Sequence, residues 1–186
     1  MNFNRYITEA EFSELAAFIR REGVVRRFAR GERLSGQGLR SHRCGLVVQG
    51  AFRYEHADGA GEELVVGYAF AGEFVGDYIS MCVDAPSQVT IGAMCGAEAL
   101  LVPGERLETF YRTDAACERL GRRLAEHMLA EVYERLLDRY AASPQQRYEA
   151  LTERCPDVLQ LVPLRELASY LGVRPETLSR IRRRVR

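Results

Sequence analysis

Arginines gather near the C-terminal end of the chain, in a pattern that suits contacts with nucleic acid. Residues 163 to 186 contain seven arginines (165, 174, 180, 182, 183, 184 and 186) and two glutamates, hence a net charge of +5. The 186 residues hold 26 basic and 26 acidic side chains in all, which leaves −5 for residues 1–162. Every basic residue is an arginine, whose planar guanidinium can make paired hydrogen bonds to guanine or phosphate.

Two short helices are predicted around Gly172, and they would position these arginines. Gly172 can take the positive φ of a tight turn, and Val173 is expected to fill the core beneath it. Pro175 suits the first position of the second helix, with Glu176 in the first turn, where the helix dipole favours a carboxylate. The first helix is indicated by apolar residues at i, i+3, i+4 and i+7: Leu164, Leu167, Ala168 and Leu171.

The second of these helices should have an apolar face and a polar face. At about 100° per residue, Leu178, Ile181 and Val185 fall on the core side. This is the layout of a helix-turn-helix whose second helix enters the DNA major groove. The residues predicted to contact DNA are Arg174, Glu176, Thr177, Ser179, Arg180, Arg182, Arg183 and Arg184.

The side-chain types on the polar face fit the chemistry of base edges and phosphates. Arg180 can bond guanine O6 and N7 together, and Glu176 can accept from cytosine N4. The flanking arginines and Thr177 are expected at phosphate height. A solvated amphipathic helix pair without function is the alternative. Because the small Ala168, the glycine turn and the apolar spacing coincide, DNA binding is favoured.

Upstream, the distribution of glycine predicts a β domain. Fourteen of the sixteen glycines lie between Gly23 and Gly104, separated by short apolar or alternating runs. We expect an antiparallel barrel or jelly roll of roughly seven to eight strands. The predicted strand regions are Val24–Ala29, Gly45–Tyr54, Leu64–Ala69, Val89–Met94 and Ala99–Val102.

Between the two regions, Glu105 to Ala142 contains almost no helix breaker and predicts one long helix, with Thr113 or Asp114 suited to cap it. Its apolar residues form two sectors, one for the barrel and one for a second copy of the chain, although both could pack within a monomer. The residues assigned to dimerisation are Leu120, Leu124, Met128, Val132 and Leu136.

Ser143 and Pro144 then predict the start of a shorter helix, Gln145–Arg154, and Cys155-Pro156 is a candidate hinge. The predicted class is α+β in three parts. They are an N-terminal helix with a β jelly roll over residues 1–111, a long dimerisation helix over 112–142 and a helix-turn-helix unit over 143–186.

Taken together, these features resemble the Crp/Fnr (cyclic-AMP receptor protein / fumarate–nitrate regulator) superfamily of bacterial transcription regulators. The likeness spans nearly the whole chain and is greatest to short members of the Bacteroidetes type. It implies a homodimer on the long helix, an effector pocket in a cyclic-nucleotide-binding-like β domain, and sequence-specific DNA binding at an inverted repeat, with RNA polymerase a further candidate partner. The stretches that carry it are Gly72–Tyr78, Pro86–Ile91, Ser143–Tyr148 and Leu167–Arg182.

The resemblance places an effector pocket at Gly76, Asp77, Ser87 and Gln88. Relatives that bind cyclic nucleotides have glycine and glutamate for the ribose hydroxyl, and an arginine that pairs with the cyclic phosphate. Here the first pair is Gly76-Asp77, and Ser87 stands at the arginine position. A phosphate buried without a cation is costly, so we expect no tight binding of cyclic AMP. The effector stays unknown, and Asp77 could simply cap a turn.

In the second helix the family pattern arginine–glutamate–threonine–x–x–arginine appears as Pro175–Arg180. The glutamate and second arginine are kept and the first arginine is a proline, which changes the expected target sequence but not the docking mode. The given sequence ends at Arg186 without the β-hairpin wing of longer members, and whether the wing is naturally missing stays open. The arginines of 182–186 are hypothesised to add phosphate contacts instead.

Other function classes find little support in the residues. The five cysteines (44, 82, 95, 117, 155) and three histidines (42, 56, 127) are scattered, without metal-ligand or disulfide spacing. No catalytic motif appears, so we predict neither an enzyme nor a cofactor or metal. Without a signal-peptide or membrane-spanning pattern, the prediction is a soluble cytoplasmic protein. The alternative function is an effector-binding adaptor that acts through protein contacts with a degenerate helix-turn-helix.

Overall fold

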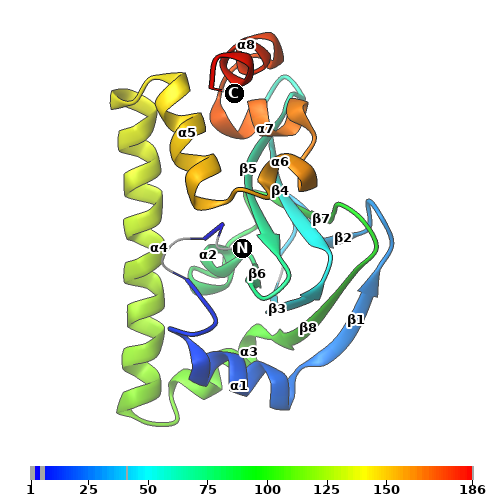
Figure 1. Ribbon diagram of the computed structural model, residues 1–186. Helices are drawn as coiled ribbons and strands as arrows, with labels where there is room; N and C mark the ends of the chain where they lie inside the picture. The colour runs from blue at the N-terminus through cyan, green and yellow to red at the C-terminus, as the bar shows by residue number, and fades with distance from the viewer. Residues whose placement is uncertain (1–2, 5–6, 41, 186) are drawn as a thin grey trace.

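The computed structural model describes residues 3–4, 7–40 and 42–185. Two four-stranded antiparallel sheets, in the orders β1-β8-β3-β6 and β2-β7-β4-β5, form a sandwich that helices flank at both ends (Figure 1). The strands are β1 Val24–Phe28, β2 Arg33–Ser35, β3 Arg43–Gln49, β4 Ala51–Ala57, β5 Glu63–Phe70, β6 Phe74–Gly76, β7 Thr90–Ala93 and β8 Ala97–Pro103. The helices are α1 Ser13–Glu22, α2 Tyr78–Cys82, α3 Gly104–Tyr111, α4 Ala115–Ala141, α5 Pro144–Arg154, α6 Val158–Leu161, α7 Leu164–Leu171 and α8 Pro175–Val185.

The eight strands agree with the expected antiparallel architecture, and alternating side chains fill the space between the sheets. Phe28 from β1, Phe52 from β4 and Ile91 from β7 are all buried in this core. The prediction of one strand region from Gly45 to Tyr54 was wrong. Gly50 adopts φ +82° and turns the chain, so β3 and β4 lie in different sheets. The short strands β2 and β6 were not predicted.

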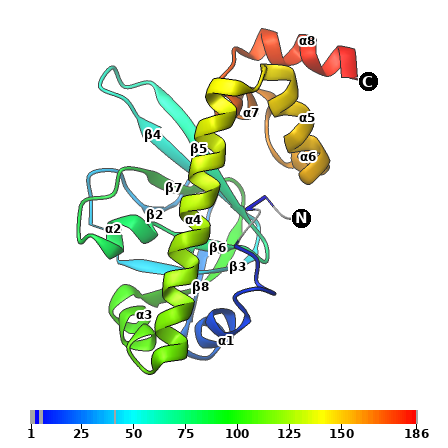
Figure 2. The ribbon, with the colours of Figure 1, turned by 90° about the vertical axis from the view of Figure 1, so that its left-hand side faces the viewer.

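The prediction of one helix from Glu105 to Ala142 was also wrong. The chain forms α3 and then α4, with a break at residues 112–114. The Asp114 carboxylate accepts hydrogen bonds from the backbone N–H groups of Ala116 and Cys117 at 2.7 and 2.8 Å, and thereby starts the second helix. The new start lets α4 turn and run along the outside of the molecule from α3 to α5 (Figure 2).

The two apolar sectors of α4 differ in burial. Leu120 and Leu124 are only 7% and 6% exposed because they pack with α1 and the β1-β8-β3-β6 sheet, and Met128 packs at the edge of this cluster. The assignment of Leu120 and Leu124 to a contact with a second copy is therefore corrected, and that of the half-buried Met128 stays a prediction. Val132 and Leu136 are 60% and 50% exposed, as the assignment requires. They belong to an exposed apolar face of α4: Leu129, Val132, Tyr133, Leu136, Leu137 and Tyr140.

Beyond α4, the last four helices share one core with the outer side of the β2-β7-β4-β5 sheet. Ser143 caps α5 in a capping box with Gln146, as its position next to Pro144 predicted. Cys155, the candidate hinge, is fully buried beside Leu151, Leu167 and other residues of this core. In the part of the chain that the structure describes, no helix is both long and apolar enough to cross a membrane.

Candidate nucleic-acid interface and ligand cavity

The helices α7 and α8 form the predicted pair around a tight turn. Gly172 adopts φ +65° and ψ +42°, the left-handed conformation that glycine allows. The Val173 N–H donates to the Ala168 carbonyl at 3.0 Å, and the Arg174 carbonyl accepts from the Leu178 N–H at 3.1 Å. Ala168 and Leu178 are fully buried where the two helices cross. The turn therefore holds α8 at a fixed angle to α7.

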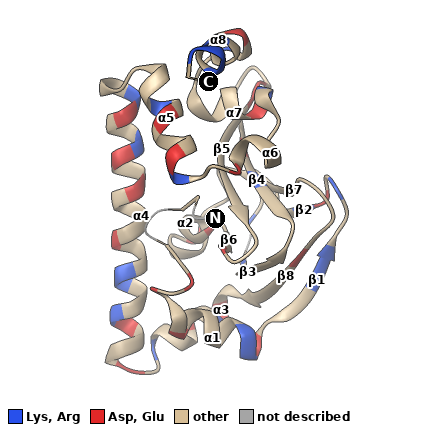
Figure 3. Ribbon diagram, in the orientation of Figure 1, with Lys and Arg blue, Asp and Glu red and all other residues tan. Residues whose placement is uncertain are grey.

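One face of α8 and the residue before it are polar and open to solvent. Within the described residues, no arginine of this face makes a hydrogen bond or an ion pair. Figure 3 shows the blue ribbon of these arginines in α8, at one end of the molecule. Val185 was predicted to be core but is 43% exposed, because it lies in the last turn, beyond the packed helices. Of the predicted DNA contacts, Arg174, Glu176, Arg180, Arg183 and Arg184 are exposed, and Thr177, Ser179 and Arg182 are half-buried.

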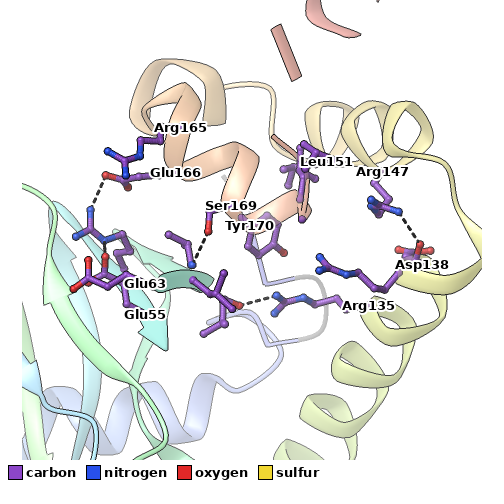
Figure 4. A pocket seen from close by; sticks show the side chains of 18 of the residues that line it. Glu55, Glu63, Arg135, Asp138, Arg147, Leu151, Arg165, Glu166, Ser169 and Tyr170 are labelled. Atoms are coloured by element: carbon purple, nitrogen blue, oxygen red, sulfur yellow. Dashed lines mark hydrogen bonds and ion pairs between the residues drawn. The ribbon is translucent and has the colours of Figure 1, made fainter. Parts of the chain in front are cut away.

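On the opposite side of the α7–α8 pair, α7 contacts the edge strand β5 and the neighbouring β4 (Figure 4). Glu166 accepts from Arg53 Nη1 at 2.6 Å. Ser169 Oγ accepts from the Val65 N–H at 2.9 Å. These contacts border a cleft of about 1190 Å³ between α4, α5, α7 and the β4-β5 hairpin.

Arg135 of α4 links three elements at the same place. Its Nη2 donates to the Val66 carbonyl of β5 at 2.6 Å, and its guanidinium lies 4.8 Å from the ring centre of Tyr170 in α7. Arg135 was not predicted from the sequence to have a functional role. Its position on α4 is visible in the sequence, but its two partners come from segments 35 or more residues away.

The N-terminal segment also joins the sandwich to α7. The ring of Phe3 lies 5.3 Å from that of Tyr68 in β5 and 5.2 Å from that of Tyr170 in α7. The buried Glu73 fixes this segment by accepting from the Phe3 N–H at 2.7 Å and from Asn4 Nδ2 at 2.9 Å. Burial raises the pKa of the Glu73 carboxyl, and its hydrogen bonds partly oppose that shift. This contact was not predicted from the sequence.

Two of the four residues predicted to form the effector pocket, Asp77 and Ser87, are bonded to each other. Asp77 caps α2 by accepting from the Ser80 N–H at 3.1 Å, so the turn-capping alternative describes it correctly. Its other carboxylate oxygen accepts from Ser87 Oγ at 2.5 Å, and Ser87 is 1% exposed. Gln88 is exposed. None of these four residues is positively charged, so they offer no cation to an anionic ligand.

A cavity of about 220 Å³ lies close by, between α4 and the sandwich. Gly76 is the only one of the four predicted pocket residues that lines it. The Tyr54 hydroxyl closes one end, where it accepts from the Gly76 N–H at 3.1 Å. Burial raises the pKa of Tyr54 well above its usual value, which keeps the phenol neutral.

Among residues 3–4, 7–40 and 42–185 there is no group of three or more histidine, cysteine or acidic side chains arranged for a metal ion. The five cysteines are free thiols.

Comparisons with known proteins agree with this architecture. Residues 25–114 match the family model described as the cyclic nucleotide-binding domain. No curated protein matches the chain by sequence. FixK2 from Bradyrhizobium japonicum is similar in structure, with a TM-score of 0.74 at 18% identity over 88% of this chain and 84% of that one.

Two further solved structures extend the likeness. A putative cAMP-binding regulatory protein from Silicibacter pomeroyi has a TM-score of 0.68 and 26% identity, over 97% of this chain and 82% of that one. A putative transcriptional regulator of the Crp/Fnr family from Eubacterium rectale has a TM-score of 0.68 and 15% identity, over 90% of this chain and 80% of that one. Residues 25–114 thus match the cyclic nucleotide-binding domain, and the chain shares its fold with solved structures that include a putative transcriptional regulator of the Crp/Fnr family.

Proposed function

We propose that the chain is a homodimeric, sequence-specific DNA-binding transcriptional regulator, controlled by a small molecule other than cyclic AMP in its β domain. The observation that carries this proposal is the exposed polar face of α8, where arginines have no partner among the described residues. Arginines left unpaired in this way are available to phosphates and base edges, and α8 is held on a buried core that fixes its direction.

The face divides naturally into base-reading and phosphate-binding parts. Arg180 and Glu176 are exposed and lie one helical turn apart, so both can reach base edges from the N-terminal half of α8. Arg182, Arg183 and Arg184 follow in the last turn, where they would contact the backbone.

The exposed apolar face of α4 supports the homodimer. Six large apolar side chains exposed on one helix are unusual for a surface in water, and a second copy packed against them would bury them. In a two-fold dimer the two α8 helices would read an inverted repeat with half-sites about 34 Å apart.

Cyclic AMP fits the β domain poorly. Ser87 stands where the relatives that bind cyclic nucleotides have an arginine, and its hydroxyl is hydrogen-bonded to the Asp77 carboxylate. A cyclic phosphate at this place would meet a carboxylate instead of a cation, which disfavours binding.

The test begins with selection of bound fragments from random DNA at one fixed salt concentration, which reveals symmetry and half-site spacing together. Arg180→Ala should then weaken binding to the selected site by about 1–3 kcal/mol in fluorescence anisotropy, with little change on random DNA. Arg27→Ala is the matched control, because Arg27 is a highly exposed arginine on β1. Equal losses on both DNAs would show that Arg180 touches only phosphate.

A second measurement separates DNA binding from the adaptor alternative. Deleting residues 182–186, of which Arg186 lies outside the described residues, should reduce the slope of log affinity against log salt by about 0.9 for each phosphate that the truncated chain no longer neutralises. An adaptor would show no salt-sensitive DNA binding with the intact chain. An unchanged slope would contradict a phosphate-binding role for these arginines.

A further inference from the structure

Phe3 lies in a pocket that three separate elements share. Its ring meets those of Tyr68 and Phe70 in β5 edge to face, with distances of 5.3 and 5.6 Å between ring centres. On the other side are the ring of Tyr170 in α7, at 5.2 Å, and the guanidinium of Arg154 in α5, at 5.6 Å. Phe3 is 1% exposed. Its side chain therefore fills a space between the sandwich and the helices that follow α4.

Polar contacts hold this segment to the sandwich. Glu73, between β5 and β6, is only 4% exposed. Its carboxylate accepts from the Phe3 N–H at 2.7 Å, from the Asn4 N–H at 3.3 Å and from Asn4 Nδ2 at 2.9 Å. Asn4 Nδ2 also donates to the Tyr68 carbonyl at 3.3 Å. Among the described residues, the Phe70 N–H is the only other donor to this carboxylate, so loss of the segment would leave a buried carboxyl group with one hydrogen bond.

The contact of this segment with α5 and α7 is of a different kind. Within the part of the chain that the structure describes, no hydrogen bond joins residues 3–4 to either helix, and the contact consists of the Phe3 ring against Tyr170 and Arg154. Such a contact can part without leaving a buried donor or acceptor unpaired, whereas the contacts with Glu73 cannot. If the two regions separate, the segment should therefore stay on the sandwich and lose only α5 and α7.

The Phe3 ring contacts α7 at the place where this helix lies against β5. Tyr170, which Phe3 touches, is preceded by Ser169, whose Oγ accepts from the Val65 N–H of β5 at 2.9 Å. Through the turn at Gly172, α7 in turn carries α8. A residue that holds Tyr170 in place therefore also restrains the position of α8.

We propose that residues 3–4 act as a clasp on the α7–α8 unit, residues 164–185. Glu73 fixes the clasp to the sandwich, and the Phe3 ring holds α7 against β5. When the unit moves, the contact between Phe3 and Tyr170 opens while the contacts with Glu73 stay closed. The inference rests on the proposed function, because it concerns the mobility of the helix that would read DNA.

Hydrogen exchange of the Val65 amide reports the release of α7. This N–H donates to Ser169 Oγ across the contact, so it exchanges with solvent deuterium when α7 moves away from β5. Phe3→Ala should speed the exchange about tenfold or more, because α7 loses the ring that packs on it. NMR of the full chain without DNA measures the rate for each amide.

Phe52→Ala is the matched control. Phe52 is also fully buried, but it packs between the two sheets with Phe28 and Ile91. Release of α7 leaves that core intact, so Phe52→Ala should destabilise the whole chain and yet change the Val65 exchange rate by less than about twofold. Phe3→Leu and Phe52→Leu repeat the comparison with smaller losses of packing, and serve if an alanine variant does not fold.

Two results would overturn the proposal. Equal acceleration of Val65 exchange in the Phe3 and Phe52 variants would show that α7 leaves β5 only when the whole chain unfolds. An unchanged rate in the Phe3 variants would show that Phe3 does not restrain α7. Because these samples contain no DNA, failure of the clasp is separate from failure of DNA binding, which the Arg180→Ala comparison on selected and random DNA tests independently.

Discussion

The α7–α8 unit and the β sandwich use their polar side chains in opposite ways. Along α8 the arginines point to solvent without partners among the described residues. In the sandwich, Asp77, Ser87 and Tyr54 are satisfied by one another or by backbone groups, and an apolar cavity remains beside them. The polar groups of α8 are open to a partner, whereas those of the sandwich are already used within the fold. The net charge of zero is the sum of +5 over residues 163–186 and −5 over residues 1–162, so it describes neither region.

The largest effect on stability is expected at a buried residue of the α7–α8 unit, residues 164–185, rather than at one of its exposed arginines. Leu178→Ala should lower the free energy of unfolding by about 2–5 kcal/mol, because the fully buried side chain leaves a cavity. Val185→Ala, in the last turn and 43% exposed, should change it by less than about 0.5 kcal/mol. Urea unfolding measures both. Similar effects at the two positions would contradict the difference in packing along α8.

A smaller effect is expected in the sandwich. Ser87→Ala removes the buried hydroxyl that donates to Asp77 and should cost about 1–3 kcal/mol, since the half-buried Asp77 carboxylate loses its donor. The neighbouring exposed residue provides the control, and Gln88→Ala should stay within about 0.5 kcal/mol of the unaltered chain. If Ser87→Ala is neutral in urea unfolding, the polar groups of the sandwich are not paired as described.

The turn of the α7–α8 unit offers a third test. Gly172→Ala should cost about 1–2 kcal/mol, because φ +65° is unfavourable for residues with a Cβ atom. The new Cβ would also lie 1.6 Å from the present position of Arg139 Nη1, so that side chain must move. Gly59→Ala has open space and no positive φ, and should be nearly neutral in thermal unfolding. Equal costs would show that the turn conformation is unimportant.

The smallest effect concerns the N-terminal segment that touches both regions. The folded-state pKa of Glu73 is raised above its ordinary 4.5, so its contribution to stability is fully present below pH 4.5 and is lost as the pH rises through the folded value. The unfolding free energy of the unaltered chain minus that of Glu73→Gln should therefore increase as the pH falls toward 4.5. The exposed Glu62→Gln is the control. A difference independent of pH would contradict the raised pKa.

The α7–α8 unit could be predicted from the sequence because its determinants are local. Leu167, Ala168 and Leu171 follow helical spacing within two turns, and Gly172 comes directly after them. The cap at Ser143 is equally local, since its partner Gln146 is three residues away. Short-range geometry of this kind needs no knowledge of the rest of the fold.

The cavity could not be predicted in the same way. Tyr54, Phe74 and Leu124 meet there from positions 20 to 70 residues apart, and nothing in their spacing brings them together. The side of α4 that packs inward depends on where that helix begins, and Asp114 sets this point only because the chain breaks before it. For that reason Leu120 and Leu124 were assigned to the wrong sector, whereas the presence of two sectors was correctly inferred.

The attachment of α7 to β5 has a consequence for solubility. β5 is the last strand of its sheet, and its Val65 N–H and Val66 carbonyl would face solvent if Ser169 and Arg135 did not bind them. Unpaired edges of apolar strands template pairing with other chains. If the α7–α8 unit moves away from the sandwich, another segment must therefore cover this edge. Otherwise the protein becomes prone to aggregation in that state.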